Sequence, residues 1–139
     1  TKEELDAAVH AGVIEYLGNL QNPYELIQKC NCMVLPSFYR EGVPRILLEA
    51  AAMGKPLIAA DSTGTREPVD HGVNGFLCKP DSTDDLVLQI RAFLELGAAQ
   101  KIRMGLASRK IAETRYTDTI ISDSYTTKIR ELLKNEQVF

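Results

Sequence analysis

The stretch SFYREGVPRILLE, residues 37–49, decides the fold of this chain. An apolar run, CMVLP at residues 32–36, comes directly before it. The order is therefore a buried strand, a polar loop and an amphipathic helix that begins at Pro44, because proline loses nothing at the first helical position. In open α/β sheets, a helix N-terminus beyond the carboxyl end of a strand binds phosphorylated ligands. The stretch predicts such a site beside two carboxylates, Glu41 and Glu49.

Strand and helix signals alternate along the rest of the chain. We expect strands at 13–17, 32–36 (buried on both faces), 56–60 and 75–78, and helices at 2–10, 23–29, 44–53, 81–96, 98–113 and 117–135. This alternation predicts an α/β fold, a partial Rossmann-like doubly wound parallel sheet with additional C-terminal helices. No internal repeat or low-complexity linker divides the chain, so residues 1–139 are predicted to form a single domain.

The predicted connections also place a ligand crevice. Right-handed crossovers put the carboxyl ends of parallel strands on one edge of the sheet. Three segments follow strands at that edge: residues 37–44, 61–66 and 78–81. We therefore expect the crevice to run along these three segments.

Composition narrows the classes of function. The chain has 139 residues and a net charge of −3, which offers no electrostatic case for binding nucleic acid. No apolar run approaches the length of a membrane span. Three cysteines (Cys30, Cys32 and Cys78) and two histidines lack the spacing of a zinc site, and they suit a reducing, cytoplasmic compartment. The acids at 81–85 are typical of a helix start rather than of a metal site.

The loop and helix of residues 37–49 suggest separate binding roles for backbone N–H groups and for the two carboxylates. Backbone N–H groups of Gly42, Val43 and Arg45 would surround the positive end of the helix and hold a diphosphate without a metal ion. Gly42 lacks a Cβ, so the backbone there can approach a ligand closely. Glu41 would accept hydrogen bonds from the hydroxyls of a sugar. Glu49 leans back toward the helix N-terminus and would reach the hydroxyls of a ribose.

Residues 13–81 resemble the carboxyl-terminal nucleotide-binding domain of GT-B glycosyltransferases of the retaining family 4. The hallmark of that family is a Glu, seven residues and a second Glu within a longer phrase. Here the phrase consists of Pro36-Ser37, Glu41-Gly42 and Leu47-Leu48-Glu49-Ala50. The resemblance implies a catalytic role for Glu41 and donor binding by Ser37, Gly42, Val43, Arg45 and Glu49.

The resemblance also implies a reaction. A hexose would move from a nucleotide diphosphate sugar, such as a UDP- or GDP-sugar, to an acceptor hydroxyl with retention and with no metal or other cofactor. The segment REGVPR, residues 40–45, resembles the subset of the family that builds bacterial surface polysaccharides and lipid-linked glycans. The implied acceptor is therefore a glycan or lipid-linked glycan. The intact enzyme would be cytoplasmic or peripheral at the inner face of the membrane.

The chain departs from the family pattern at its start. In the family, two strands and a diphosphate-binding Arg and Lys precede the position of Thr1, so the fragment alone is expected to be inactive. The strand at 32–36 would then have an unpaired apolar edge, which recruits another strand. We expect either that residues 13–17 pair with 32–36 or that two chains associate through this edge.

Several alternatives stay open at the level of sequence. A GT-B UDP-sugar epimerase or phosphorylase, a receiver-like signalling module and a non-catalytic nucleotide-sugar sensor are the rival functions. Glu49 and Arg45 also have the spacing of a surface ion pair. Phe38 and Tyr39 either line the sugar site or cover the end of the strand.

Overall fold

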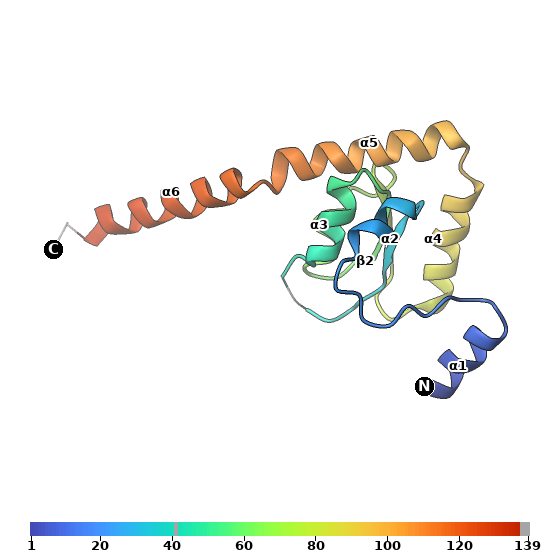
Figure 1. Cartoon of the computed structure of the whole chain (residues 1–139). Coiled ribbons are helices and arrows are strands. Elements are labelled where there is room, and N and C mark those ends of the chain that lie inside the picture. Colours follow the sequence, from blue (N-terminus) through green and yellow to red (C-terminus); the bar gives the residue numbers. More distant parts are fainter. Residues whose placement is uncertain (41, 137–139) are drawn as a thin grey trace.

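The computed structural model describes residues 1–40 and 42–136 (Figure 1). Helices and strands follow one another as the sequence predicts, apart from the missing strand discussed below. Their bounds are α1 (Lys2–His10), α2 (Tyr24–Lys29), β1 (Met33–Leu35), α3 (Arg45–Ala52), β2 (Leu57–Ala60), β3 (Gly75–Cys78), α4 (Thr83–Glu95), α5 (Ala98–Arg115) and α6 (Asp118–Glu136).

The strands form one parallel sheet in the order β1-β2-β3. Met33 lies opposite Leu57, which in turn lies opposite Gly75. The central strand, β2, is buried along its whole length. The predicted α/β class with a parallel sheet is therefore confirmed.

Two predictions about the sheet are wrong. Residues 13–17 form no strand, because no described segment lies beside them to complete the backbone hydrogen bonds. They do not pair with β1. The strand β1 is not buried on both faces either, since it lies at the edge of the sheet and Val34 is 39% exposed.

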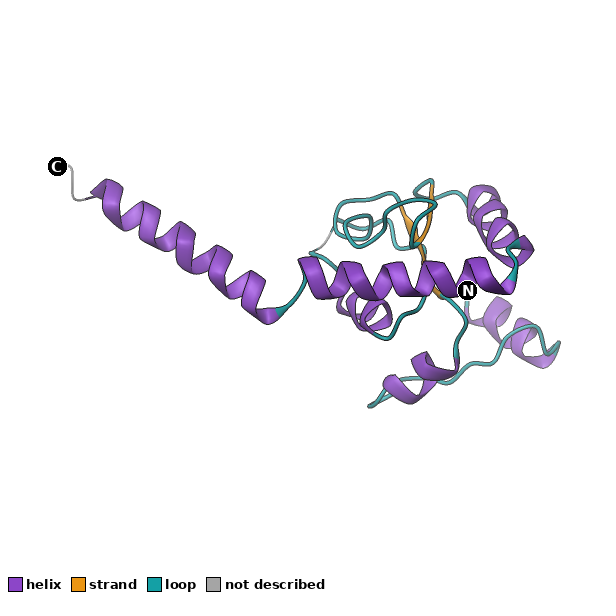
Figure 2. Cartoon of the chain, turned by 90° about the horizontal axis from the view of Figure 1, so that it is seen from above, coloured by secondary structure: helices purple, strands orange, loops and turns teal. Residues whose placement is uncertain are grey.

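Alternate residues of β2 belong to two separate apolar clusters. Leu57 and Ala59 pack in the cluster that contains α3, and Ile58 packs in the cluster that contains Phe93 of α4 and Met104 of α5. Successive side chains of a strand point to opposite faces of the sheet. The helices α3 and α4 therefore cover opposite faces, with the strands between them (Figure 2).

Helix α5 crosses the end of α3 that is distant from the strand carboxyl ends (Figure 1). Contact is close there, because a Cβ atom on Gly105 would lie only 2.2 Å from the carbonyl oxygen of Gly54. A guanidinium N–H of Arg109 also donates to the carbonyl of Ala52. These contacts fix α3 against both the sheet and α5.

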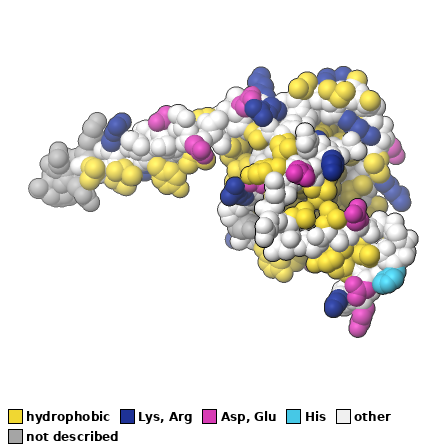
Figure 3. Space-filling model, viewed as in Figure 1, with side chains coloured by type: hydrophobic (Ala, Val, Ile, Leu, Met, Phe, Trp, Pro, Cys, Tyr) yellow, Lys and Arg dark blue, Asp and Glu magenta, His cyan; other side chains and the backbone are white. Residues whose placement is uncertain are grey.

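Helix α6 extends away from the rest of the described chain (Figure 1). Apolar side chains gather along one side of it (Figure 3), and the exposed ones at helical spacing are Ile121, Tyr125, Ile129 and Leu132. Within residues 1–40 and 42–136, no helix combines the length and the apolar character needed to cross a membrane.

Candidate functional site

Three loops meet at the carboxyl edge of the sheet. The hydroxyl of Ser62, after β2, donates to the carbonyl of Phe38, after β1, at 3.2 Å. The N–H of Asp61 donates to the carbonyl of Cys78, the last residue of β3, at 2.8 Å. The segments after β1, β2 and β3 thus lie together at one edge, as the strand connections predict.

The helix that follows β1 begins one residue later than the sequence predicts. Pro44 is the N-cap with extended backbone angles, φ −63° and ψ 125°, and Arg45 is the first helical residue. No side chain caps this N-terminus at Pro44, and its first turn contains no acid. Because proline cannot donate, the N–H groups of Arg45 and Ile46 are the ones without a partner inside the helix.

Two other helices, α4 at this edge and α1 at the start of the chain, differ from α3 because a side chain caps their N-termini. The side chain of Thr1 accepts from the N–H of Glu4 in α1, and the side chain of Ser82 accepts from the N–H of Asp85 in α4. An uncapped N-terminus keeps its N–H groups and its partial positive charge available for an anion. At the carboxyl edge, Ser82 caps α4, whereas Pro44 provides no such side-chain cap for α3, as far as the described residues show.

Glu49 lies on the second turn of α3, and its carboxylate is already hydrogen-bonded. Its Oε1 accepts from Nε of Arg45 at 2.7 Å and from the hydroxyl of Tyr24 at 3.1 Å. The Glu49 side chain is only 17% exposed. Tyr24 and Glu49 raise the pKa of the Arg45 guanidinium, so this partner stays charged. The i, i+4 ion pair foreseen as an alternative therefore exists, and a ligand hydroxyl would have to share this carboxylate.

Sequence reasoning missed Tyr24. It is the first residue of α2 and lies 25 residues before Glu49 in the chain. No motif relates the two positions, because their contact depends on how α2 packs beside α3. Its hydroxyl fixes the orientation of the Glu49 carboxylate from the α2 side.

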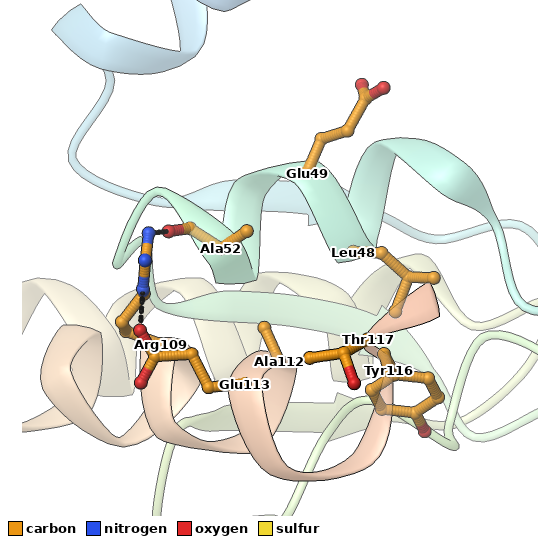
Figure 4. A pocket seen from close by; sticks show the side chains of 8 residues that line it. All are labelled: Leu48, Glu49, Ala52, Arg109, Ala112, Glu113, Tyr116 and Thr117. Carbon is orange, nitrogen blue, oxygen red and sulfur yellow. Dashed lines mark hydrogen bonds and ion pairs between the residues drawn. The ribbon is translucent and has the colours of Figure 1, made fainter. Parts of the chain in front are cut away.

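A cavity of about 340 Å³ lies between α3 and the end of α5 (Figure 4). Leu48, Ala112 and Tyr116 form much of its apolar wall. Glu49 borders this cavity, but its carboxylate points away from the side chains of α5 (Figure 4). This cavity therefore adjoins the predicted donor site, with which it shares Glu49.

The remaining predicted residues lie in the loop between β1 and α3. Gly42 is exposed, whereas Ser37 and Val43 are half-buried. Arg45 is exposed at the first position of the helix. Glu41 lies outside the described residues, so its position relative to Glu49 stays a prediction.

The chain is similar in sequence to known glycosyltransferases. A sequence model of the family described as "Glycosyl transferases group 1" matches residues 2–111. The N,N'-diacetylbacillosaminyl-diphospho-undecaprenol alpha-1,3-N-acetylgalactosaminyltransferase of Campylobacter jejuni is 33% identical over 128 residues, covering 91% of this chain and 33% of that protein. The human alpha-1,3/1,6-mannosyltransferase ALG2 is 33% identical over 108 residues, covering 75% of this chain and 25% of that protein.

Solved structures share the fold. The crystal structure of Anabaena Alr3699/HepE in complex with UDP has a TM-score of 0.81 and 26% identity, covering 94% of this chain and 36% of that one. Sucrose-phosphate synthase from Thermosynechococcus elongatus has a TM-score of 0.79 and 24% identity, covering 96% of this chain and 34% of that one. The chain thus spans about a third of the length of these proteins.

Proposed function

Because the chain belongs to the glycosyl transferases group 1 family, we propose that it forms the nucleotide-sugar-binding part of a retaining hexosyltransferase. The N-terminus of α3 takes the diphosphate of a UDP- or GDP-sugar. Glu49 takes the ribose hydroxyls, and Glu41 takes the sugar near the reacting carbon. Ser37, Gly42 and Val43 complete the donor site, and no metal ion is required.

The observation that carries this proposal is the N-terminus of α3, where the N-cap residue Pro44 provides no side-chain hydrogen bond and no described side chain is recorded as a cap. It lies at the carboxyl edge of a parallel sheet, where open α/β folds bind ligands. A negatively charged group placed there gains hydrogen bonds and a favourable interaction with the helix dipole. During transfer, the same N–H groups stabilise the charge that develops on the leaving diphosphate without first having to reorganise.

The comparisons supply the chemical class of the ligand. HepE was crystallised with UDP and with UDP-glucose, which favours a nucleotide sugar at the corresponding edge of this chain. The name of the Campylobacter relative describes transfer to a sugar on diphospho-undecaprenol. We therefore propose a lipid-linked or surface glycan as the acceptor of the intact enzyme, which would work in the cytoplasm or at the inner face of the membrane.

Calorimetric titration with UDP, GDP and ADP tests the donor site. We expect one of these nucleotides to bind and Glu49→Gln to weaken its binding at least tenfold, about 1.4 kcal/mol. Glu113→Gln is a matched control, because Glu113 forms the same i, i+4 ion pair with Arg109 on α5 at 2.6 Å. Equal losses in the two variants, or no binding of any nucleoside diphosphate, would contradict the proposal.

A further inference from the structure

The carboxylate of Glu49 uses only one of its two oxygens within the described chain. Its Oε1 accepts from Nε of Arg45 at 2.7 Å and from the hydroxyl of Tyr24 at 3.1 Å. Among the described residues, no group donates to Oε2. Because a carboxylate oxygen accepts about two hydrogen bonds, Oε1 is fully used and Oε2 is the atom that a ligand hydroxyl can reach.

The two donors to Oε1 differ in how firmly they are held. Arg45 lies one turn before Glu49 on the same helix, and its side chain is 84% exposed. Tyr24 approaches from the neighbouring helix α2. Fixing a tyrosine, which has few rotatable bonds, costs less conformational entropy than fixing a long arginine side chain. Tyr24 is therefore the donor better suited to fixing the direction of the carboxylate.

Several contacts fix α2 beside α3. At the start of α2, Oδ1 of Asn22 accepts from the N–H of Tyr24 at 3.1 Å. In its middle, Ile27 is fully buried and packs in the apolar cluster that contains α3. Near its end, Nζ of Lys55, which follows α3, donates to the carbonyl of Gln28 at 2.8 Å. The Tyr24 hydroxyl is therefore presented to the carboxylate by a helix that is itself held in place.

The free oxygen belongs to a side chain that is only partly shielded from water. The Glu49 carboxylate points away from the side chains of α5 (Figure 4), and the side chain is 17% exposed. It lies on the second turn of α3, close to the N-terminus proposed to hold the diphosphate. A site that accepts a hydrogen bond from a substrate hydroxyl rejects an analogue without that hydroxyl, because its own polar group then stays unpaired.

We propose that Tyr24 is a positioning residue that makes the donor site selective for ribonucleoside over 2′-deoxyribonucleoside diphosphates. The inference rests on the proposed function, in which Glu49 binds the ribose hydroxyls. Tyr24 and Arg45 together occupy Oε1, so that Oε2 is held in place for the 2′-hydroxyl. A deoxyribose offers no hydroxyl at that position and binds more weakly. The donor class thereby narrows to sugars carried on ribonucleotides.

Calorimetric titration of the 139-residue chain with UDP, GDP, 2′-deoxy-UDP and 2′-deoxy-GDP tests this assignment. We expect UDP or GDP to bind roughly tenfold more tightly than its 2′-deoxy analogue. Tyr24→Phe removes only the hydroxyl. It should weaken binding of the ribonucleotide about fivefold, as the loss of one hydrogen bond does. Binding of the 2′-deoxy analogue should stay unchanged, so the selectivity falls by the same factor.

Two further variants separate positioning from packing. Tyr125→Phe makes the same chemical change at an exposed position on α6 and should leave both affinities unchanged. In a Glu49→Gln background, Tyr24→Phe should have no further effect on the selectivity, because the hydroxyl acts through the carboxylate. The ratio of the two affinities is the informative measurement, since a loss of packing weakens both nucleotides alike.

Each contrary result has its own meaning. An unaltered chain that binds UDP or GDP no better than the 2′-deoxy analogue would overturn the ribose selectivity while the donor site stands. Equal losses for both nucleotides in Tyr24→Phe would leave Tyr24 a structural role only and overturn the proposal. Failure of the transferase proposal instead appears as an unaltered chain that binds no nucleoside diphosphate, and the ribose selectivity then fails with it.

Discussion

Among single residues, Asn74 joins the turn before β3 to helix α5. Its fully buried side-chain amide donates to the carbonyl of Pro68 at 2.9 Å and to the hydroxyl of Ser108 at 3.3 Å, and its Oδ1 accepts from the N–H of Asp70 at 2.7 Å. The Ser108 hydroxyl donates back to the carbonyl of Asn74 at 3.1 Å. Both polar side chains are thus satisfied only by each other and by nearby backbone.

We expect Asn74→Ala to lower the free energy of unfolding by about 3 kcal/mol, because it leaves several buried groups without hydrogen-bond partners. Urea unfolding followed by circular dichroism measures this loss. The control is Asn31→Ala, at an exposed position, where a change within about 0.5 kcal/mol is expected. A loss of the same size in both variants would mean that the Asn74 network contributes little.

A second residue, Cys32, should make stability depend on pH at the alkaline end. Burial, with a smaller contribution from Cys30, raises the pKa of the Cys32 thiol from an ordinary 9.0 to about 12. Between these values the unfolded chain loses the thiol proton while the folded chain keeps it. Stability is therefore unaffected by this group below about pH 9 and falls as the pH rises above it, by at most about 1.4 kcal/mol per pH unit.

The comparison with Cys32→Ala isolates this contribution, because the other alkaline groups are common to both proteins. We expect the stability of the unaltered chain to fall more steeply than that of the variant between pH 9 and pH 10.5, in urea titrations at fixed ionic strength. Parallel curves for the two proteins over that range would exclude a raised thiol pKa.

Sequence reasoning located residues whose role is set by their immediate neighbours. Ser82 caps α4 within the stretch 81–85 that the sequence marks as a helix start, since a cap depends on the three residues that follow it. The pairing of Glu49 with Arg45 was foreseen for the same reason. Tyr24 was not foreseen, because its hydrogen bond to Glu49 requires the tertiary packing of α2.

At the scale of elements, the contact between α3 and α5 depends on one glycine. A Cβ on Gly105 would lie 2.2 Å from the Gly54 carbonyl oxygen, closer than atoms can approach. We expect Gly105→Ala to force the helices apart and to lower the melting temperature, at a cost of about 1–3 kcal/mol. A loss of stability would be informative, because replacing glycine by alanine in a helix without such a contact would stabilise that helix by about 1 kcal/mol.

Gly97→Ala provides the control for that substitution. Gly97 precedes α5, and the nearest atom to an added Cβ is Oε1 of Gln100 at an ordinary 3.6 Å. Its melting temperature should stay close to that of the unaltered chain in calorimetry. A rise in melting temperature for Gly105→Ala would show that α5 does not pack on Gly54 in this way.

Elements could be predicted where local sequence determines them, and could not where they depend on tertiary neighbours. The bounds of β3 are those expected, Gly75–Cys78, because glycines mark the turn before it and a central strand lies ready to pair with it. Residues 13–17 have an equally apolar pattern but form no strand, because a strand needs a neighbour that local sequence does not reveal. At the site, the helix start after β1 was predictable to within one residue.

At the scale of the whole molecule, the sheet ends in a strand with a free edge. The N–H of Met33 donates to the carbonyl of Pro56 on the β2 side at 2.9 Å. Because backbone groups alternate in direction along a strand, the N–H and C=O of Val34 face the outer side of β1. In the described chain no other strand pairs with that side. Such an edge is a template for a strand of another chain.

We therefore expect two copies to associate through β1, which is the alternative left open once residues 13–17 fail to pair there. Sedimentation velocity over a concentration series should show a dimer that Val34→Lys shifts toward monomer, because lysine on an edge strand opposes pairing. Val87→Lys on α4 is the matched control, since Val34 is 39% exposed and Val87 is 40% exposed. A chain that stays monomeric throughout the series, or two lysine variants that dissociate equally, would show that the β1 edge recruits no partner.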